Sequence, residues 1–168
     1  MNRQRMRGVY VVEFAIIGLL LFTLLFGVLE MGRLYFTVNA LDEVVRRGAR
    51  LAAVCDIRDP VILRRAIFNA ADEAGASRLI GRLQTADLSL VYLNETGATV
   101  ASPDDFDSAS GFRAIRYVQL RVENFPHELL IPGFGGVFTL PAFRSTIPRE
   151  SLGRHAETDA PGPEITPC

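Results

Sequence analysis

The sequence predicts an α+β protein in which one long N-terminal helix packs on a small antiparallel sheet. Three observations support this prediction: an unbroken apolar run near the N-terminus, a helical stripe of apolar residues directly after it, and alternating apolar segments in the second half of the chain. Helical segments followed by a run of strands are typical of α+β architecture. The 168-residue chain has room for one small domain beyond the apolar run.

The apolar run covers residues 9–29 and contains one charged residue, Glu13. As a helix it is about 31 Å long, which matches a bilayer core of about 30 Å. Arg3, Arg5 and Arg7 precede it without any acidic residue among them. Since basic residues tend to stay on the cytoplasmic side, we expect a single-pass protein with a cytoplasmic N-terminus and an external C-terminal domain.

The helix is expected to continue beyond the membrane. The following apolar residues recur at helical spacing along residues 30–54: Leu34, Val38, Leu41, Val45, Gly48, Ala49 and Ala52. One continuous helix over residues 9–54 is therefore predicted, whose outer part carries the domain on its apolar face. The small residues Gly48 and Ala49 suit the close approach of another element.

The remaining chain is predicted to be a small α+β domain over residues 55–153. Asp59 and Pro60 suit the start of a second helix, over residues 60–74, and a helical turn at 77–83 is considered. Strands are expected at 88–93, 98–101, 114–125 and 137–147, the last interrupted by Pro141. The segment 154–168 is rich in Pro, Gly and acidic residues and is predicted to be an irregular tail.

Glu13 needs an explanation because a charge within a spanning helix is costly. One explanation is that its carboxylate reaches the headgroups, since it lies only about 6 Å from the cytoplasmic end of the run. The other is a partner inside the membrane, and cleavage after Gly8 would supply a backbone amine. An ordinary secretory signal fits poorly, because the run is too long and no small-residue cleavage site follows it. A plain signal anchor is the remaining alternative.

Four stretches carry a resemblance to a known family. Residues 8–14, Gly-Val-Tyr-Val-Val-Glu-Phe, resemble the processing motif of type IV pilin-like proteins in its Tad form. Residues 25–35 contain Gly-Val-Leu-Glu-Met-Gly-Arg, and residues 44–54 contain Arg-Arg-Gly-Ala-Arg, both similar to stretches of the TadE family of pseudopilins. Residues 140–146 and 149–150 are similar, less specifically, to the family's closing strand. The resemblance implies a pilin-like fold.

The resemblance also implies a role for individual residues. Residues 1–8 would be a leader peptide, with Gly8 its last residue and Val9 the mature N-terminus after cleavage by a prepilin-type peptidase. Glu13 would pair with the N-terminal amine of a neighbouring subunit. Other pilin-like subunits and an inner-membrane pilus assembly platform would be its partners. The implied location is the bacterial inner membrane, with the domain in the periplasm and incorporation in a pilus as one option.

Glu30 and Arg33 stand three residues apart at the outer end of the apolar run, so they share a helix face. One interpretation is an exposed ion pair that contributes little to stability. The alternative, supported by the resemblance, is a packing or partner role. The family-like stretches add further packing or partner candidates: Gly32, Arg46, Gly48, Ala49 and Arg50.

Cys55 and Cys168 are the only cysteines, and both fall on the external side. An oxidising compartment permits a disulfide bond between them. Such a bond would close a loop contributing about 4.7 kcal/mol in the chain-entropy model. The alternative is two free or separately paired thiols.

The sequence offers no constellation of residues typical of an enzyme. His127 and His155 are isolated from metal-ligand spacings, and the cluster Asp104, Asp105 and Asp107 lacks the spacing of a calcium loop. No metal and no cofactor are expected. The net charge of -1 gives no bias toward nucleic acid.

These observations favour a membrane-anchored minor pilin or pseudopilin that takes part in Tad-type pilus assembly, secretion and adhesion. An unprocessed, membrane-anchored binding or sensor domain is the alternative. A membrane-anchored enzyme is the weakest of the three hypotheses.

Overall fold

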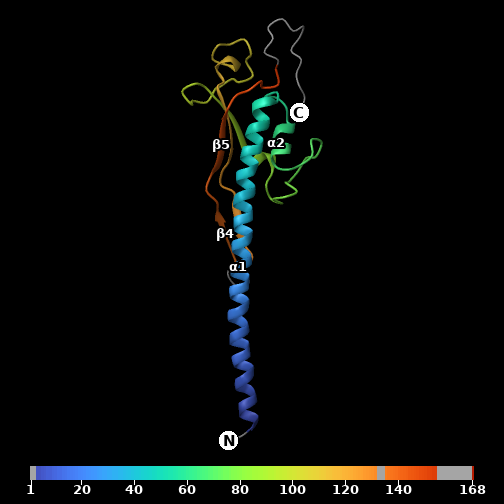
Figure 1. Ribbon diagram of the computed structural model, residues 1–168, viewed down its shortest axis with the longest axis vertical. Coiled ribbons are helices and arrows are strands. Elements are labelled where there is room, and N and C mark those ends of the chain that lie inside the picture. Colours follow the sequence, from blue (N-terminus) through green and yellow to red (C-terminus); the bar gives the residue numbers. More distant parts are fainter. Residues whose placement is uncertain (1–2, 132–134, 155–167) are drawn as a thin grey trace. The chain divides into compact units, whose positions relative to one another are not determined.

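The computed structural model describes residues 3–131, 135–154 and 168, with side chains described from residue 8 onward. Its dominant element is the helix α1, Arg3–Val54, which runs without interruption from the predicted leader through the amphipathic stripe (Figure 1). The helix contains no proline, so its backbone hydrogen bonds can continue unbroken through the apolar run, as a membrane-spanning segment requires. The chain divides into two compact units, residues 1–36 with 126–138 and residues 37–125 with 139–168.

The first unit contains the apolar part of α1 and most of a two-stranded sheet. The strands are β3, Pro126–Leu129, and β4, Gly136–Thr139. From Val9 to Leu29, every residue except the half-buried Gly18 and Gly27 is exposed. An apolar surface that no other described residue covers distinguishes this segment from the core helix of a soluble protein. One helix of the described chain is long and apolar enough to cross a membrane.

The second unit is built on a three-stranded antiparallel sheet of β1, Leu88–Leu93, β2, Tyr117–Val122, and β5, Phe143–Pro148, in the order β1-β2-β5. Leu90 of β1 lies opposite Leu120 of β2, which lies opposite Ser145 of β5. A short helix α2, Val61–Ala66, and two 3₁₀ turns, η1 at Thr85–Asp87 and η2 at Phe112–Ala114, complete the unit. The predicted α+β class, with the long helix on a small antiparallel sheet, is confirmed.

The core of the second unit lies between α1 and this sheet. The helix stripe is buried there from Leu41 onward, while Val118, Leu120 and Val122 of the central strand face it without exposure. The closest approach is at Gly48, where a Cβ atom would clash with Leu120 Cδ2 and stand 2.8 Å from Ala66 Cβ. A residue without a side chain therefore allows α1, α2 and β2 to meet at one point.

The end of α1 is held by a segment from the other end of the chain. The carbonyl of Ala53 accepts hydrogen bonds from the amides of Glu150 and Leu152, and the carbonyl of Val54 accepts one from Gly153. The last carbonyls of a helix have no partner within the helix, so this segment supplies the missing donors. Gly153 has φ +74°, and a Cβ there would stand 2.7 Å from Asp56 Cα. Glycine is the residue that suits such a position.

Some predicted elements are shorter than expected. The helix predicted over residues 60–74 ends at Ala66, because Phe68 has φ 66° and the side chain of buried Asn69 bonds the backbone of Ala76 and Arg78. The helical turn considered at 77–83 is wrong. The hydroxyl of Ser77 instead donates to the carbonyl of Ile67 and accepts the amide of Ile80, which holds a loop.

The strand predictions also need correction. The strand expected over residues 114–125 is limited to β2, and the expected return strand at 98–101 is a single bridge between Leu93 and Thr99. The segment 137–147 is not one strand, because β4 and β5 on either side of Pro141 belong to different sheets. Of the predicted tail 154–168, only Arg154 and Cys168 lie within the described residues.

Candidate processing and subunit-interaction sites

The predicted processing site is on an accessible part of α1. Gly8 and Val9 are both exposed, and a Cβ built on Gly8 would have no atom within 4 Å. The helix continues on both sides of the Gly8–Val9 bond, since α1 begins at Arg3. The geometry leaves the bond open to another protein.

Glu13 is exposed one turn further along the same helix. Among the side chains that the structure describes, none forms a hydrogen bond or ion pair with it. Its neighbours at helical spacing, Val9, Tyr10, Ile16 and Ile17, are apolar and exposed. A carboxylate on an apolar surface is costly to bury unless it meets a cation or a donor. This position therefore suits a partner outside the chain.

Glu30 has a different environment, although it lies on the same helix. Its side chain is buried, with 7% of the residue exposed. Nη1 of Arg33 lies 2.8 Å from Oε1 and 2.7 Å from Oε2 of the carboxylate. The interpretation of Glu30 and Arg33 as an exposed ion pair is thus wrong for Glu30.

Two groups from the β3–β4 region complete the surroundings of Glu30. Nε2 of His127, a residue only 4% exposed, lies 3.1 Å from Oε1, and the amide of Leu130 donates to Oε2 at 3.2 Å. The guanidinium of Arg33 also reaches the carbonyl of Glu128, at 3.4 Å. One carboxylate therefore joins the helix to the strand β3 and the residue after it. We call Glu30, Arg33, His127 and the Leu130 amide the Glu30 cluster.

The Glu30 cluster favours the ionised carboxylate. Burial by itself would raise the pKa of Glu30. The hydrogen bonds from Leu130, His127 and Arg33, together with the charge of Arg33, outweigh burial and hold the pKa below its ordinary value. The negative charge is thus part of the folded arrangement of the first unit.

The other packing candidates fall into two groups. Gly48 and Ala49 are buried in the core of the second unit, so their role within the chain is packing. Gly32, Arg46 and Arg50 are exposed, and Arg46 pairs with Asp42 of the same helix at 2.6 Å. A Cβ on Gly32 would meet nothing within 4 Å, which leaves this side of α1 open to a neighbouring molecule.

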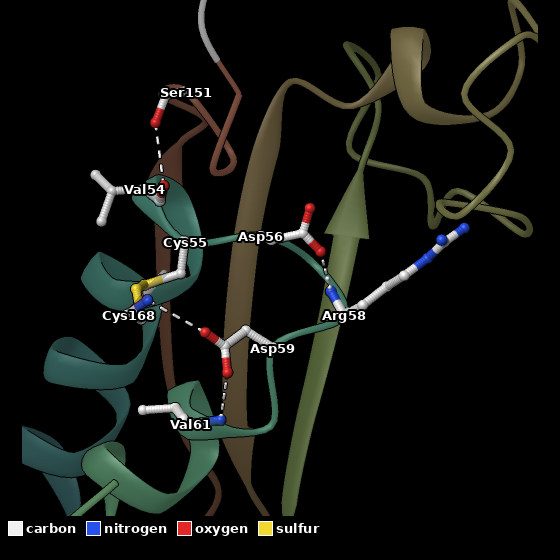
Figure 2. The surroundings of a disulfide bond; sticks show 8 residues. All are labelled: Val54, Cys55, Asp56, Arg58, Asp59, Val61, Ser151 and Cys168. Atoms are coloured by element: carbon white, nitrogen blue, oxygen red, sulfur yellow. Dashed lines mark hydrogen bonds between the residues drawn. A yellow bond between two sulfur atoms is a disulfide. The ribbon is translucent and has the colours of Figure 1, made fainter. Parts of the chain in front are cut away.

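The two cysteines form a disulfide bond in the structure. Cys55 directly follows α1, and its Cα lies 5.8 Å from that of Cys168 (Figure 2). The Asp59 carboxylate accepts a hydrogen bond from the Val61 amide at the start of α2 and another from the Cys168 amide. As Figure 2 shows, the end of α1 and the start of α2 are joined to the last residue of the chain.

The cluster of Asp104, Asp105 and Asp107 is explained by hydrogen bonds within its own loop. Oδ1 of Asp105 accepts the amides of Asp107 and Ser108, which fixes the turn. Within residues 3–131, 135–154 and 168, no group of three or more His, Cys, Asp or Glu side chains could hold a metal ion.

Comparison with known protein families finds a match in the N-terminal part of the chain. The model of the TadE-like protein family matches residues 8–50, which include the processing motif, the Glu30–Arg33 stretch and the Gly48–Ala49 stretch. No curated protein and no solved structure matches the chain. The predicted TadE-like resemblance is confirmed over this segment. It associates the chain with Tad pilus systems, and together with the long apolar helix it indicates a membrane-anchored protein.

The Glu30 cluster also shows what sequence reasoning missed. In the sequence, His127 stands apart from any metal-ligand spacing, and nothing in the residues around it points to Glu30, which is 97 positions away. An amide donor such as that of Leu130 has no sequence signature at all. Only the pairing of Glu30 with Arg33 was accessible from helical spacing.

Proposed function

We propose that the chain is a minor pilin or pseudopilin of a Tad-type system, made as a precursor and cleaved between Gly8 and Val9 by a prepilin-type peptidase. The observation that carries the proposal is the TadE-like match over residues 8–50, which begins at Gly8 itself. The exposed apolar surface of residues 9–29 supports it, since only lipid or other apolar helices can cover that surface favourably.

Glu13 would then act as the subunit-pairing carboxylate. Cleavage creates an amine on Val9, and Glu13 lies one turn further along the helix. In a low-dielectric environment, a carboxylate of one subunit and an amine of the next attract strongly, and either one left alone carries a large penalty. The pair would set the axial register of packed helices. Other pilin-like subunits and the assembly platform of the inner membrane would be the partners, with the second unit in the periplasm.

The test has two parts, and the first is the N-terminal sequence of the protein recovered from membranes of its native host. A start at Val9 is expected. A start at Met1 or Asn2 would contradict processing and favour the unprocessed anchored binding or sensor domain.

The second part compares Glu13→Ala with Thr23→Ala in the same apolar run. Thr23 is exposed, and its hydroxyl donates only to the Leu19 carbonyl of its own helix. We expect Glu13→Ala to be cleaved and inserted normally but to lose co-assembly with other pilin-like subunits, measured by cross-linking and pilus yield. Thr23→Ala should assemble normally. Normal pilus assembly by Glu13→Ala would remove the role assigned to this carboxylate.

A further inference from the structure

The second unit contains an open hollow of about 580 Å³ lined by two phenylalanines and four arginines, a volume within the range of about 300–1,000 Å³ typical of ligand pockets. The lining residues, which we call the arginine pocket, are Phe106, Phe112, Arg113, Arg116, Arg149 and Arg154. Neither the match to residues 8–50 nor the proposed role in assembly involves these residues. Among the residues that the structure describes, no acidic side chain lines the hollow.

The sheet itself brings two of these arginines together. Tyr117, the first residue of β2, lies opposite Pro148, the last residue of β5. Arg116 and Arg149 are the next residues outward, and the amide of Arg149 donates to the carbonyl of Arg116 at 2.9 Å. Like charges on adjacent strands repel each other, so this end of the sheet carries an unfavourable interaction. Burial, and after it the charge of Arg116, lower the pKa of Arg149.

The structure positions these guanidinium groups with neutral partners. Nη1 of Arg116 donates to the carbonyls of Arg113 and Ile115, at 2.9 and 3.1 Å. Nη1 of Arg149 donates to the carbonyls of Phe112 and Ile115, both at 3.2 Å. Carbonyl acceptors orient the guanidinium groups but do not neutralise them. Each group has five N–H donors, so most of them stay available.

Aromatic rings fix the remaining orientation. The guanidinium carbon of Arg154 lies 3.6 Å from the ring centre of Phe106, and that of Arg149 lies 5.2 Å from the ring centre of Phe112. Stacking of this kind holds the plane of the guanidinium without removing its charge.

Carboxylates near the pocket are few among the described residues. Nη2 of Arg154 is 4.0 Å from Oδ2 of buried Asp56, at the outer limit of an ion pair. Nε of Arg154 is buried and has no hydrogen-bond partner in the described part of the chain. The side chains of Arg113, Arg116 and Arg149 form no ion pair with a described carboxylate. The pocket thus concentrates positive charge on a chain whose net charge is -1.

We propose that the arginine pocket binds a polyvalent oxyanion, a group of the phosphate or polycarboxylate kind. Planar guanidinium forks match the geometry of these groups and bind them through two parallel hydrogen bonds. A polyvalent anion would also relieve the repulsion between Arg116 and Arg149. A free small anion and a charged group on a longer polymer share this chemistry.

The test is isothermal titration calorimetry on the full chain in an uncharged detergent, with inorganic phosphate, citrate and tripolyphosphate as probes. The decisive variant is Arg113→Gln, because this exposed side chain forms no hydrogen bond or ion pair with the other described residues. The matched control is Arg144→Gln, which removes an exposed arginine of β5 away from the pocket.

We expect one binding event per chain that weakens with added salt. Arg113→Gln should weaken it about tenfold or more, since a charge-assisted hydrogen bond is lost, whereas Arg144→Gln should change it little. Similar affinity for phosphate and tripolyphosphate would indicate that the pocket takes a single small group. Much tighter binding of tripolyphosphate would indicate that it takes a charged group on a longer polymer. Both outcomes support the proposal. No binding at millimolar concentrations, or equal losses in the two variants, would overturn it.

A second variant, Arg116→Gln, tests the like-charged pair. Its circular dichroism spectrum is recorded first, because Arg116 also holds two carbonyl groups. A folded Arg116→Gln protein with unchanged affinity would contradict the proposed site. This experiment does not depend on cleavage at Gly8 or on pilus assembly, so its failure and the failure of the proposed function can be distinguished.

Discussion

The two halves of α1 have the same secondary structure but opposite relations to the rest of the chain. Apart from Glu13, residues 9–29 present apolar side chains on every side, and these are exposed, whereas the half within the second unit carries a stripe buried against β2 and α2. The apolar side chains of the first half therefore need lipid or neighbouring helices to cover them, whereas those of the second half are covered by the core of the second unit. Apolar content alone does not decide burial; the angular distribution of the apolar residues does.

The largest expected effect on stability comes from a leucine-to-alanine substitution in the buried half of α1, compared with the same substitution in the exposed half. Leu41→Ala removes a side chain that is fully buried, so it should lower the free energy of unfolding of the second unit by about 2–5 kcal/mol. Leu21→Ala, at an exposed position, should leave it unchanged. Chemical denaturation in detergent, followed by near-ultraviolet circular dichroism, measures both. Equal losses would show that the two halves are not distinct.

The next largest effect on stability is expected from a glycine-to-alanine substitution in the buried half, compared with one in the exposed half. Gly48→Ala forces a methyl group against Leu120 and Ala66 and should destabilise the second unit by about 1–3 kcal/mol, as overpacking does. Gly27→Ala places a methyl group where nothing lies within 4 Å. The same denaturation experiment should show no loss for Gly27→Ala. A neutral Gly48→Ala would mean that the close approach of α1 to β2 is not required.

The smallest effect on the whole molecule is expected at the boundary between the halves, in the Glu30 cluster. Glu30→Ala removes the acceptor of the Leu130 amide. The local free energy of opening that hydrogen exchange measures at this amide should therefore fall by about 1–2 kcal/mol. The second unit should unfold as before. Glu43→Ala, which removes an exposed carboxylate further along the helix, is the control.

The cluster also predicts a pH dependence. The folded pKa of Glu30 is below its ordinary value of 4.5, so its contribution is present above that value. As the pH falls below it and through the lower folded pKa, the carboxylate takes up a proton and the contribution is lost. The protection factor of the Leu130 amide, which is its exchange rate compared with that of an unfolded peptide at the same pH, should therefore fall under acid conditions more steeply in the wild type than in Glu30→Ala. Parallel pH profiles in the two proteins would contradict this role of Glu30.

Much of the fold was accessible from the sequence because its signals are local. Apolar runs and helical spacing predicted the long helix, and alternation predicted β1 and a longer segment that contains the whole of β2. Helix propensity gave wrong predictions where polar side chains form the hydrogen bonds that the helix backbone would otherwise form. Asn69 and Ser77 use their polar groups to hold loops where helical structure was expected. Pro141 was recognised as an interruption, but the separation of β4 and β5 into different sheets needed the paired strands themselves.

By itself, the sequence determined the apolar span, the carboxylate within it, the TadE-like stretches and the stripe that carries the core. Each of these depends on residues a few positions apart, where helix geometry fixes which side chains are neighbours. Tertiary structure alone decided the partners of Glu30, the closing of the α1 C-terminus by residues 150–153, and the meeting of four arginines in one pocket. These groups come from distant parts of the chain, and their proximity depends on how the strands pair and the loops close.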